Sequence, residues 1–330
     1  MRALPAIPEF AEGIRQGDRV LLGRAITLVE STNAAHQALA DALLDALQAF
    51  APANDTFRVG ITGSPGVGKS TFIETLGTHL TAQGHKVAVL AVDPSSRVSH
   101  GSILGDKTRM EQLSVDPLAF IRPSPAGETL GGIARKTRET IALVEAAGYH
   151  TVLVETVGVG QSETAVHRMV DAFVLLLLPG AGDDLQGIKR GIVEMADLLV
   201  VNKSDGDRVR LANQARVHYL NALHLFPAKE SGWTPRVLAC SATEKSGLAE
   251  VWQALVEFQT HTRGNGFFAE NRRRQAQYWF QDTLEQALRT AFYSHPEVKA
   301  RLQAMEKDVL RGAVSPFAAA RLLMDALLKG

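Results

Sequence analysis

The chain has 330 residues, 45% of them hydrophobic, and its 35 basic side chains balance 35 acidic ones. This length and composition suffice for one large α/β domain with helical additions around an apolar core. The balanced charge excludes a global field that would recruit nucleic acid or an anionic membrane. The longest apolar run is far shorter than the roughly 20 residues that span a bilayer, and a basic-then-apolar signal pattern is absent. We therefore expect a soluble, cytoplasmic protein.

Residues 1–55 are predicted to form a helical extension. Leu39, Leu43 and Leu47 recur every four residues, as they would on one face of a helix, and Asn33 is a candidate N-cap. The run Ala-Pro-Ala-Asn-Asp at 51–55 has the composition of a linker. We place a domain boundary at its end.

Residues 56–263 alternate between strand and helix signals. Several candidate strands are continuous apolar runs, which suit a parallel sheet covered on both faces. Amphipathic stretches such as Ile133–Ala147, ended by Gly148, lie between them. This alternation predicts a doubly wound, mostly parallel α/β domain. The candidate strands are Arg58–Thr62, Lys86–Val92, Ala119–Arg122, Thr151–Glu155, Ala172–Leu178, Leu198–Asn202 and Arg236–Cys240.

The first of these strands runs into a glycine-rich loop that fits the G-x-x-x-x-G-K-[ST] pattern of a phosphate-binding loop, or P-loop. A helical pattern follows it. Its glycines let successive backbone N–H groups face an anion, and the helix N-terminus adds its dipole. Lys69 can reach the β- and γ-phosphates, and the Ser70 hydroxyl can bind Mg²⁺. We therefore predict nucleotide-binding residues at Gly63, Ser64, Pro65, Gly66, Val67, Gly68, Lys69, Ser70 and Thr71.

Asn202, Lys203 and Asp205 form an N-K-x-D motif after another apolar strand. The Asp205 carboxylate can accept hydrogen bonds from the N1–H and the exocyclic amine of guanine, whereas adenine offers no donor at those places. Ser241 and Ala242, after the next strand, resemble the S-A loop that backs the base in GTPases that carry an N-K-x-D motif. Alone, N-K-x-D is weak evidence for a guanine site, because chance matches are common. About 130 residues after a P-loop and followed by S-A, it is strong evidence. We predict that GTP is selected over ATP.

Three carboxylates are candidates for a metal and hydrolysis site. Asp93 ends the strand beside the P-loop strand, Asp106 opens the next helix, and Glu155 begins an E-x-x-G sequence in place of D-x-x-G. The alternatives are a turn residue for Asp93 and an N-cap for Asp106. The N–H of Gly158 can meet a γ-phosphate. No glutamine follows it directly, and we do not assign the later Gln161 to water positioning, so we predict slow turnover.

Residues 264–330 are predicted to be helical. The run Arg272–Arg274 opens a long helix, and Ser315 with Pro316 caps a final one. Their apolar stripes pack either on the core or on a second subunit, and the residues alone leave both alternatives open. The arginine run is interpreted as a solvated face, because no aromatic residues interleave it. The stripe on the long helix is Phe280, Leu284, Leu288 and Phe292.

Cys240 is the only cysteine, which excludes an internal disulfide and a cysteine-rich metal site. Because it lies in a candidate strand, we interpret it as a small buried hydrophobe. Nickel delivery, which would need Cys or His ligands at metal spacing near mobile loops, is therefore disfavoured. A cell-division type of ATPase would carry a second lysine early in the P-loop, where Ser64 and Pro65 stand.

Several sequence strings together resemble one known family. In order along the chain, they are GSPGVGKST, VDPSS, GSILGDKTRM, ETVGVGQSET, PGAGDDLQGIK and NKSD. With these strings the chain is similar to the MeaB/ArgK family, the GTPases associated with adenosylcobalamin-dependent methylmalonyl-CoA mutase. The resemblance extends over essentially the whole chain and departs at His100, where a second glycine is common.

The resemblance implies particular roles for these residues. Lys69 and Ser70 would serve the phosphates and Mg²⁺, and Asp93, Asp106 and Glu155 would form the metal and hydrolysis cluster. Gly101–Arg109 and Glu155–Glu163 would be switches I and II. A homodimer would form through the C-terminal helices. An additional switch that signals to the mutase would contain Gly182, Asp183, Asp184, Gln186 and Lys189.

The function implied is that of a G-protein chaperone. Its GTP-bound and GDP-bound states would gate adenosylcobalamin delivery to an acyl-CoA mutase and protect or reactivate that enzyme, with slow hydrolysis that the mutase stimulates. The chain carries no cobalamin-binding D-x-H-x-x-G, which agrees with this role. The alternative is a kinase or ATPase linked to basic amino-acid transport, against which N-K-S-D and the lack of a membrane segment both argue.

Overall fold

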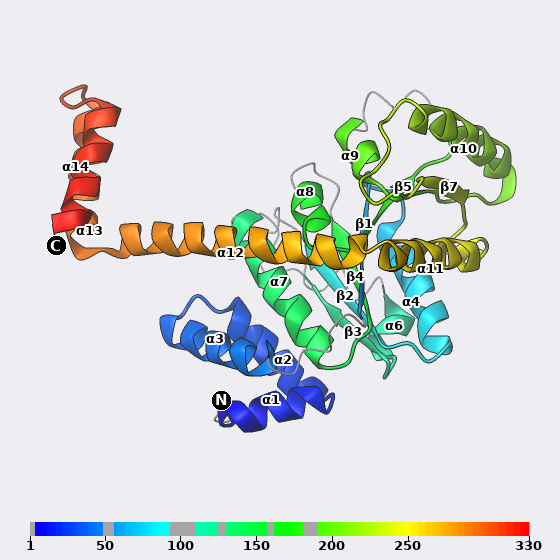
Figure 1. Cartoon of the computed structure of the whole chain (residues 1–330), viewed down its shortest axis with the longest axis horizontal. Helices are drawn as coiled ribbons and strands as arrows, with labels where there is room; N and C mark the ends of the chain where they lie inside the picture. The colour runs from blue at the N-terminus through cyan, green and yellow to red at the C-terminus, as the bar shows by residue number, and fades with distance from the viewer. Residues whose placement is uncertain are drawn as a thin grey trace. The chain divides into compact units, whose positions relative to one another are not determined.

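The computed structural model describes residues 4–48, 56–92, 110–123, 130–156, 162–180 and 190–329. The chain divides into two compact units, Met1–Arg272 and Arg273–Gly330. The first unit contains the β-sheet and the helices that cover it (Figure 1). In its described part the second unit has helices as its only regular elements.

The first unit is built on a parallel seven-stranded sheet with the strand order β3-β2-β4-β1-β5-β6-β7. All the predicted strands are present, with ends that differ from the predicted ones by at most one residue. β1 lies at the centre, between β4 and β5, so the P-loop leaves the middle of the sheet. The strands are β1 (Phe57–Gly63), β2 (Val87–Val92), β3 (Ala119–Arg122), β4 (Thr151–Thr156), β5 (Ala172–Leu177), β6 (Leu198–Val201) and β7 (Arg236–Ala239).

Helices cover both faces of the sheet, which confirms the doubly wound α/β fold (Figure 1). One face carries α4 (Lys69–Ala82), α6 (Glu111–Val115) and α11 (Leu248–Gly264). The other carries α7 (Leu130–Ala146), α8 (Ser162–His167), α9 (Arg190–Met195) and α10 (Val209–Leu223), which follows the short 3-10 helix η2 (Gly206–Arg208).

The pleat of β1 explains how this strand serves both layers. Alternate side chains of a strand point to the same face, so Val59 and Ile61 lie together on the face that α4 covers. Both are fully buried in the core there. Gly60 faces α8, and a Cβ at this position would lie 2.8 Å from Cδ2 of Phe173. Glycine at position 60 therefore lets α8 and β5 pack directly against the central strand.

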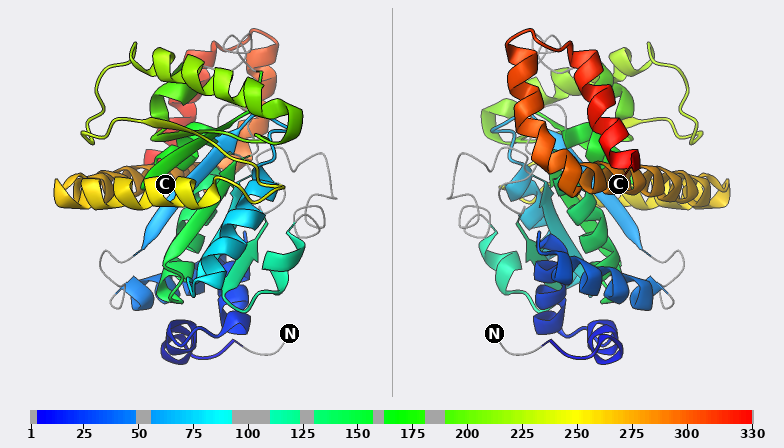
Figure 2. Two further views of the ribbon diagram at one scale, coloured as in Figure 1. Left: turned by 90° about the vertical axis from the view of Figure 1, so that its right-hand side faces the viewer. Right: turned by 90° about the vertical axis from the view of Figure 1, so that its left-hand side faces the viewer.

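The helical extension at the N-terminus consists of α1 (Ile7–Arg15), α2 (Arg19–Glu30) and α3 (Ala34–Gln48). These helices gather at one end of the first unit (Figure 2), where they pack on one another and on α7. The predicted cap at Asn33 is confirmed, since its Oδ1 accepts a hydrogen bond from the Ala35 N–H at 2.9 Å. Glu30 binds the guanidinium of Arg122, with 2.9 Å between Oε1 and Nε, and so ties α2 to the end of β3.

Two expectations for the long C-terminal helix α12 (Phe267–Ser294) were wrong in detail. The helix begins at Phe267, five residues before Arg272, because the Asn265 side chain accepts a hydrogen bond from the Phe267 N–H at 3.0 Å and caps the first turn. The arginine run is not uniformly solvated either. Arg273 and Arg274 are exposed, but the side chain of Arg272 is only 19% exposed and forms ion pairs.

Arg272 belongs to a buried ion network at the amino-terminal edge of the sheet. Its Nε and Nη2 donate to the two carboxylate oxygens of Asp171 at 2.5 and 2.6 Å. Nearby, Arg58 donates to both oxygens of Glu145, each at 2.6 Å. Burial raises the pKa of Glu145, but the charges of Arg58 and Arg272 outweigh it, so the net pKa lies below its ordinary value. The network joins the starts of β1 and β5 to α7 and α12.

The second unit contains the rest of α12, α13 (Pro296–Leu310) and α14 (Pro316–Lys329), and α13 packs on α14. The predicted cap of the final helix is confirmed, since Ser315 Oγ accepts from the Ala318 N–H at 3.2 Å. On α12 the side chains of Phe280, Leu284 and Leu288 are 68%, 49% and 62% exposed. No helix in the described ranges combines the length and the apolar character that crossing a bilayer requires.

The ion network yields a stability prediction. Replacing Arg272 by alanine leaves the buried Asp171 carboxylate without its guanidinium partner, so we expect unfolding free energy to fall by about 3 kcal/mol or more. Chemical denaturation followed by circular dichroism measures the change. The control Arg210→Ala removes an exposed arginine from α10 and is expected to stay within about 0.5 kcal/mol. Equal stability of the two variants would contradict a structural role for the network.

Candidate functional site

The glycine-rich loop joins the end of β1 to the start of α4 at the carboxyl-terminal edge of the sheet. Gly68 has a φ of +93°, which L side chains rarely adopt, and a Cβ there would lie 2.9 Å from Nδ2 of Asn202. Gly66 also has a positive φ, of +80°, but a Cβ there would meet nothing within 4 Å. The loop thus needs glycine at Gly68 for close approach, and at Gly66 for its backbone conformation alone.

Lys69 begins α4 and folds back over the loop. Its Nζ donates to the carbonyl oxygens of Gly63 at 2.8 Å and Ser64 at 3.3 Å. Burial lowers the pKa of Lys69, and the nearby charges of Glu155 and Glu163 only partly oppose this effect. An ammonium group held by two weak carbonyl acceptors can be transferred to a stronger acceptor such as a phosphate oxygen.

Ser70 and Glu155 meet beside Lys69. Glu155 is buried near the end of β4, next to β1, and its Oε1 accepts a hydrogen bond from Ser70 Oγ at 3.0 Å. A hydroxyl and a carboxylate at this separation fit the oxygen ligands that Mg²⁺ prefers. No group of three or more His, Cys, Asp or Glu side chains with metal-ligand geometry occurs in the residues that the structure describes.

The Asn202 side chain connects the loops after β6 and β7 to the P-loop. Its Nδ2 donates to the Val67 carbonyl at 2.9 Å, and its Oδ1 accepts from the Ala242 N–H at 3.2 Å. Lys203 adds a second connection, since its Nζ donates to the Gly66 carbonyl at 2.7 Å. Lys203 adopts a φ of +58°, a strained conformation for a non-glycine residue. Three loops from three strand ends therefore form one continuous rim.

Asp205 lies on the same rim and is largely buried. Its Oδ2 accepts a hydrogen bond from Ser241 Oγ at 2.5 Å, and its Oδ1 receives the guanidinium of Arg208. The hydrogen bonds from Ser241 and Arg208 lower the pKa of Asp205, so the carboxylate stays ionised at neutral pH. An oriented carboxylate of this kind is an acceptor for two adjacent N–H groups of a planar ring.

The structure brings together most of the residues predicted from sequence, namely the loop Gly63–Thr71, Glu155, Asn202, Lys203, Asp205, Ser241 and Ala242. Other predicted residues lie outside the described ranges, and their roles remain predictions. These are Asp93, Asp106, Gly158, Gly182, Asp183, Asp184, Gln186 and Lys189, together with the stretch Gly101–Arg109.

Sequence reasoning did not single out three contributors to the site. Glu163 is 1% exposed in the first turn of α8, and its charge acts on Lys69. The hydroxyls of Thr62 and Thr156, both buried, form a 2.8 Å hydrogen bond between the ends of β1 and β4. An acidic residue in a first helical turn and a threonine in a strand are common, so neither carries a distinctive sequence signal.

Cys240 is buried next to this rim, as predicted, with 2% exposure. Its Sγ lies 3.6 Å from Oδ1 of Asn202. Burial raises the pKa of the thiol to about 12, so it stays protonated and poorly nucleophilic near neutral pH. A metal-binding thiolate at this position is therefore disfavoured.

These features predict the reactivity of the single thiol. We expect Cys240 of the native protein to react with an aromatic disulfide reagent at about pH 8 at least a hundred times more slowly than after denaturation. Absorbance of the released thiolate measures both rates, and the plateau in denaturant provides the one-thiol calibration. A rapid, stoichiometric reaction of the folded protein would contradict the assigned burial.

The parallel sheet and the lysine- and serine-bearing loop at the end of its central strand define a P-loop GTPase fold. The chain belongs to the MeaB family, described as "Methylmalonyl Co-A mutase-associated GTPase MeaB", whose profile matches residues 22–297.

Relatives and a solved structure agree with this assignment. "Methylmalonic aciduria type A homolog, mitochondrial" from Mus musculus is 48% identical over 322 residues, which cover 95% of this chain and 78% of that protein. "GTPase ArgK" from Escherichia coli (strain K12) is 46% identical over 319 residues, covering 97% and 96%. The crystal structure of "LAO/AO transport system kinase" is similar with a TM-score of 0.75 and 40% identity, covering 98% of this chain and 99% of that one.

Proposed function

We propose that this protein is a cytoplasmic GTP-hydrolysing chaperone that gates adenosylcobalamin delivery to an acyl-CoA mutase of the methylmalonyl-CoA mutase type, and protects or reactivates that enzyme. The observation that carries the GTPase part is the Asn202 side chain, which connects the Asp205 loop to the P-loop. A base and its phosphates can then be bound by one rigid assembly. Membership of a family described as mutase-associated supports the choice of partner.

Guanine selection follows from the charge and position of Asp205. In this proposal its carboxylate accepts hydrogen bonds from N1–H and the exocyclic amine of guanine, while Ser241 and Arg208 keep it ionised and oriented. Adenine has an acceptor at N1 and no amine at C2, so it would leave the carboxylate desolvated and unpaired. Asn202 and Lys203 position the loops, and Ala242 backs the base.

Phosphate binding requires Lys69 to exchange partners. Its ammonium group would leave the carbonyls of Gly63 and Ser64 and bind the β- and γ-phosphates, while N–H groups of residues 63–71 surround them. Ser70 and Glu155 would hold Mg²⁺ or its water shell, with Asp93 and Asp106 as further proposed ligands. The metal would neutralise charge that develops on the phosphates.

Communication with the mutase requires that it bind the GTP and GDP states with different affinity, since a partner that binds both equally shifts neither. Loss of the γ-phosphate would release the N–H of Gly158 and the loop that follows Glu155. Residues 182–189, with Gly182, Asp183, Asp184, Gln186 and Lys189, are the proposed signalling segment. The alternative is a kinase or ATPase linked to basic amino-acid transport; one structural relative is named "LAO/AO transport system kinase".

The deciding experiment is a hydrolysis assay with GTP and ATP, with and without an adenosylcobalamin-dependent acyl-CoA mutase. We expect slow GTP hydrolysis that rises at least tenfold with the mutase, and no activity with ATP. The Lys69→Ala variant, which lacks the phosphate-binding ammonium group, is expected to be inactive in both conditions. A preference for ATP, or indifference to every acyl-CoA mutase tried, would favour the transport-linked alternative.

Base selection can be tested at Asp205. In Asp205→Asn the amide cannot accept from both guanine donors, so we expect GTP affinity to fall by roughly tenfold to a hundredfold. Xanthosine triphosphate, whose C2 carbonyl can accept from the new amide, is expected to bind the variant better than GTP. Fluorescent-nucleotide competition gives both constants, and the exposed Asp207→Asn change is the matched control. Unchanged GTP affinity in Asp205→Asn would refute the base assignment.

We further propose that the protein is a homodimer through its C-terminal helices, residues 264–330. The exposed stripe of Phe280, Leu284 and Leu288 on α12 supports this, because apolar side chains at four-residue spacing form a face for a second helix. A second copy of the chain offers an identical stripe, as a two-fold symmetric interface requires.

The dimer makes a direct prediction. The double variant Leu284→Asp with Leu288→Asp places charges in the apolar contact, so we expect the protein to sediment as a monomer at concentrations where the natural chain sediments as a dimer. Nucleotide affinity, determined in the other unit, is expected to stay unchanged. Gln303→Asp, at an exposed polar position of α13, is the control. A dimer that survives the double substitution would place the interface elsewhere.

A further inference from the structure

The loop after β7 is a compact unit, here called the Ser241–Ser246 loop. Two backbone hydrogen bonds between Ser241 and Ser246 close it, with N···O distances of 2.9 and 3.1 Å. Gly247 follows with a φ of +75°, and a Cβ there would lie 2.5 Å from the carbonyl oxygen of Ala239. Glycine therefore lets the chain fold back onto the end of β7. Because the loop is closed on itself, a bond that fixes one of its residues also restrains the others.

Thr75 on α4 binds this loop through its hydroxyl. Its Oγ1 lies 3.0 Å from the carbonyl oxygen of Ala242 and 2.8 Å from that of Thr71. A hydroxyl has a single hydrogen, which these two carbonyls share. Thr71 is four residues earlier in α4, where the helix itself supplies a backbone donor to its carbonyl. Within the described residues, the carbonyl of Ala242 accepts no hydrogen bond other than the one from Thr75.

The contact between Thr75 and Ala242 is shielded from water. Thr75 is 7% exposed and Ala242 is 5% exposed, although 167 residues separate them in the chain. Leu76 and Leu248, beside them in sequence and in α11, belong to the same buried core. A buried carbonyl that loses its donor is costly to leave unpaired, so the hydroxyl favours the position of the loop against α4.

The Ser241–Ser246 loop carries groups of the candidate base site. Ser241 Oγ donates to Asp205 Oδ2 at 2.5 Å, and the Ala242 N–H donates to Asn202 Oδ1 at 3.2 Å. Asn202 thus holds the N–H of Ala242, while Thr75 holds its carbonyl. Since α4 begins in the P-loop, Thr75 provides a link between the phosphate side and the base side that does not pass through Asn202.

We propose that Thr75 is a positioning residue of the nucleotide site, whose hydroxyl holds the Ser241–Ser246 loop where Asp205 and Ala242 meet the base. The inference rests on the proposed binding of a guanine nucleotide at this rim. Thr75 touches neither base nor phosphate and acts through the loop. Without its bond, the loop occupies the binding position for only part of the time, and the apparent affinity falls by that fraction. The loss depends on the base and spares phosphate binding.

Isothermal titration calorimetry of the full chain with GDP and with inorganic tripolyphosphate tests the proposal. Thr75→Val keeps the shape of the side chain and removes the hydroxyl, so we expect the dissociation constant of GDP to rise about tenfold. Tripolyphosphate has no base, and we expect its dissociation constant to stay within about twofold of that of the natural chain. Thr75→Ser restores a hydroxyl and is expected to recover most of the GDP affinity.

Thr78→Val is the matched control. Thr78 lies three residues further along α4, and its Oγ1 donates to the carbonyls of Glu74 and Thr75 in the same helix, at 2.9 and 3.1 Å. The substitution therefore removes a similar hydroxyl from the same helix without removing the bond to Ala242. We expect GDP to bind this variant within about twofold of the natural chain.

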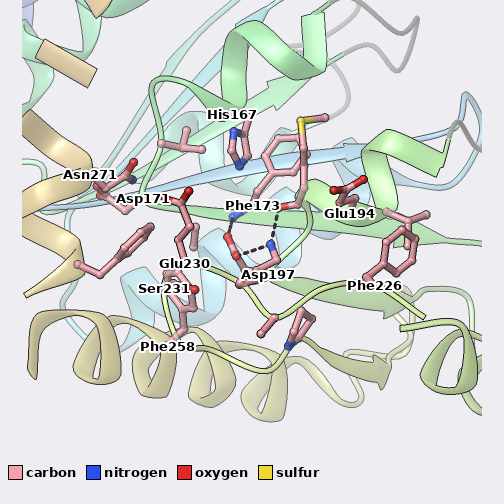
Figure 3. A pocket seen from close by; sticks show the side chains of 18 of the residues that line it. His167, Asp171, Phe173, Glu194, Asp197, Phe226, Glu230, Ser231, Phe258 and Asn271 are labelled. Carbon is pink, nitrogen blue, oxygen red and sulfur yellow. Dashed lines mark hydrogen bonds and ion pairs between the residues drawn. The ribbon is translucent and has the colours of Figure 1, made fainter. Parts of the chain in front are cut away.

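A substitution at the opposite edge of the sheet separates this effect from a general loss of stability. Asp197 precedes β6 in the wall of a cavity of about 310 Å³, where it accepts from the Phe173 N–H at 2.9 Å and from Lys229 Nζ at 2.8 Å (Figure 3). Asp197→Asn weakens the ion pair with Lys229. We expect it to lower the midpoint of thermal unfolding and to leave GDP affinity within about twofold.

Three results would overturn the role of Thr75. In the first, Thr75→Val is folded by circular dichroism and binds GDP as tightly as the natural chain. In the second, GDP and tripolyphosphate weaken equally, which would place the effect in the P-loop. In the third, Thr75→Ser binds GDP as weakly as Thr75→Val, which would assign the effect to the shape of the side chain.

Failure of the proposed function gives a different result. If the natural chain bound ADP as tightly as GDP, guanine selection would be refuted, while the comparison of Thr75→Val with Thr75→Ser would still hold for ADP. A natural chain that bound neither nucleotide would refute both the proposed function and the role of Thr75.

Discussion

The candidate site depends on one side-chain amide. Asn202 donates to the Val67 carbonyl and accepts from the Ala242 N–H, so it joins the loops after β1, β6 and β7. Each of these loops leaves the carboxyl end of a parallel strand, and the ligands of α/β sheets bind at this edge. A single amide can perform this task because it offers a donor and an acceptor in fixed geometry. Together with the bond from Lys203 Nζ to the Gly66 carbonyl, it makes the Asp205 loop and the P-loop parts of one assembly.

The opposite edge of the sheet follows different physics. Four charged side chains are buried there and neutralise one another, namely Arg58, Glu145, Asp171 and Arg272. Removing any one of them would leave a buried charge without a partner and would lower the stability of the fold. The network holds the starts of β1 and β5, while their ends remain available for loops that change partners. Rigidity is thus placed at one edge and chemistry at the other.

The features that the sequence predicted correctly are those determined by residues close to one another in the chain. Strand limits, the caps at Asn33 and Ser315, and the loop at Gly63–Thr71 depend on residues close in sequence. The exceptions depend on distant partners. Arg272 was expected in solvent because its run of arginines looked solvated, yet Asp171, 101 residues away, buries it. The influence of Glu163 on Lys69 was equally invisible, since only the tertiary fold brings α8 to the P-loop.

The lysines of the P-loop region have one further consequence. Lys69 and Lys203 donate to the carbonyl oxygens of Gly63, Ser64 and Gly66, so hydrogen bonds within the protein hold the backbone of the loop. A phosphate oxygen is a stronger acceptor for an ammonium group than these carbonyls are, so a bound anion would take over the lysine without any rearrangement of the backbone. We expect the loop to keep its shape whether or not a nucleotide is bound.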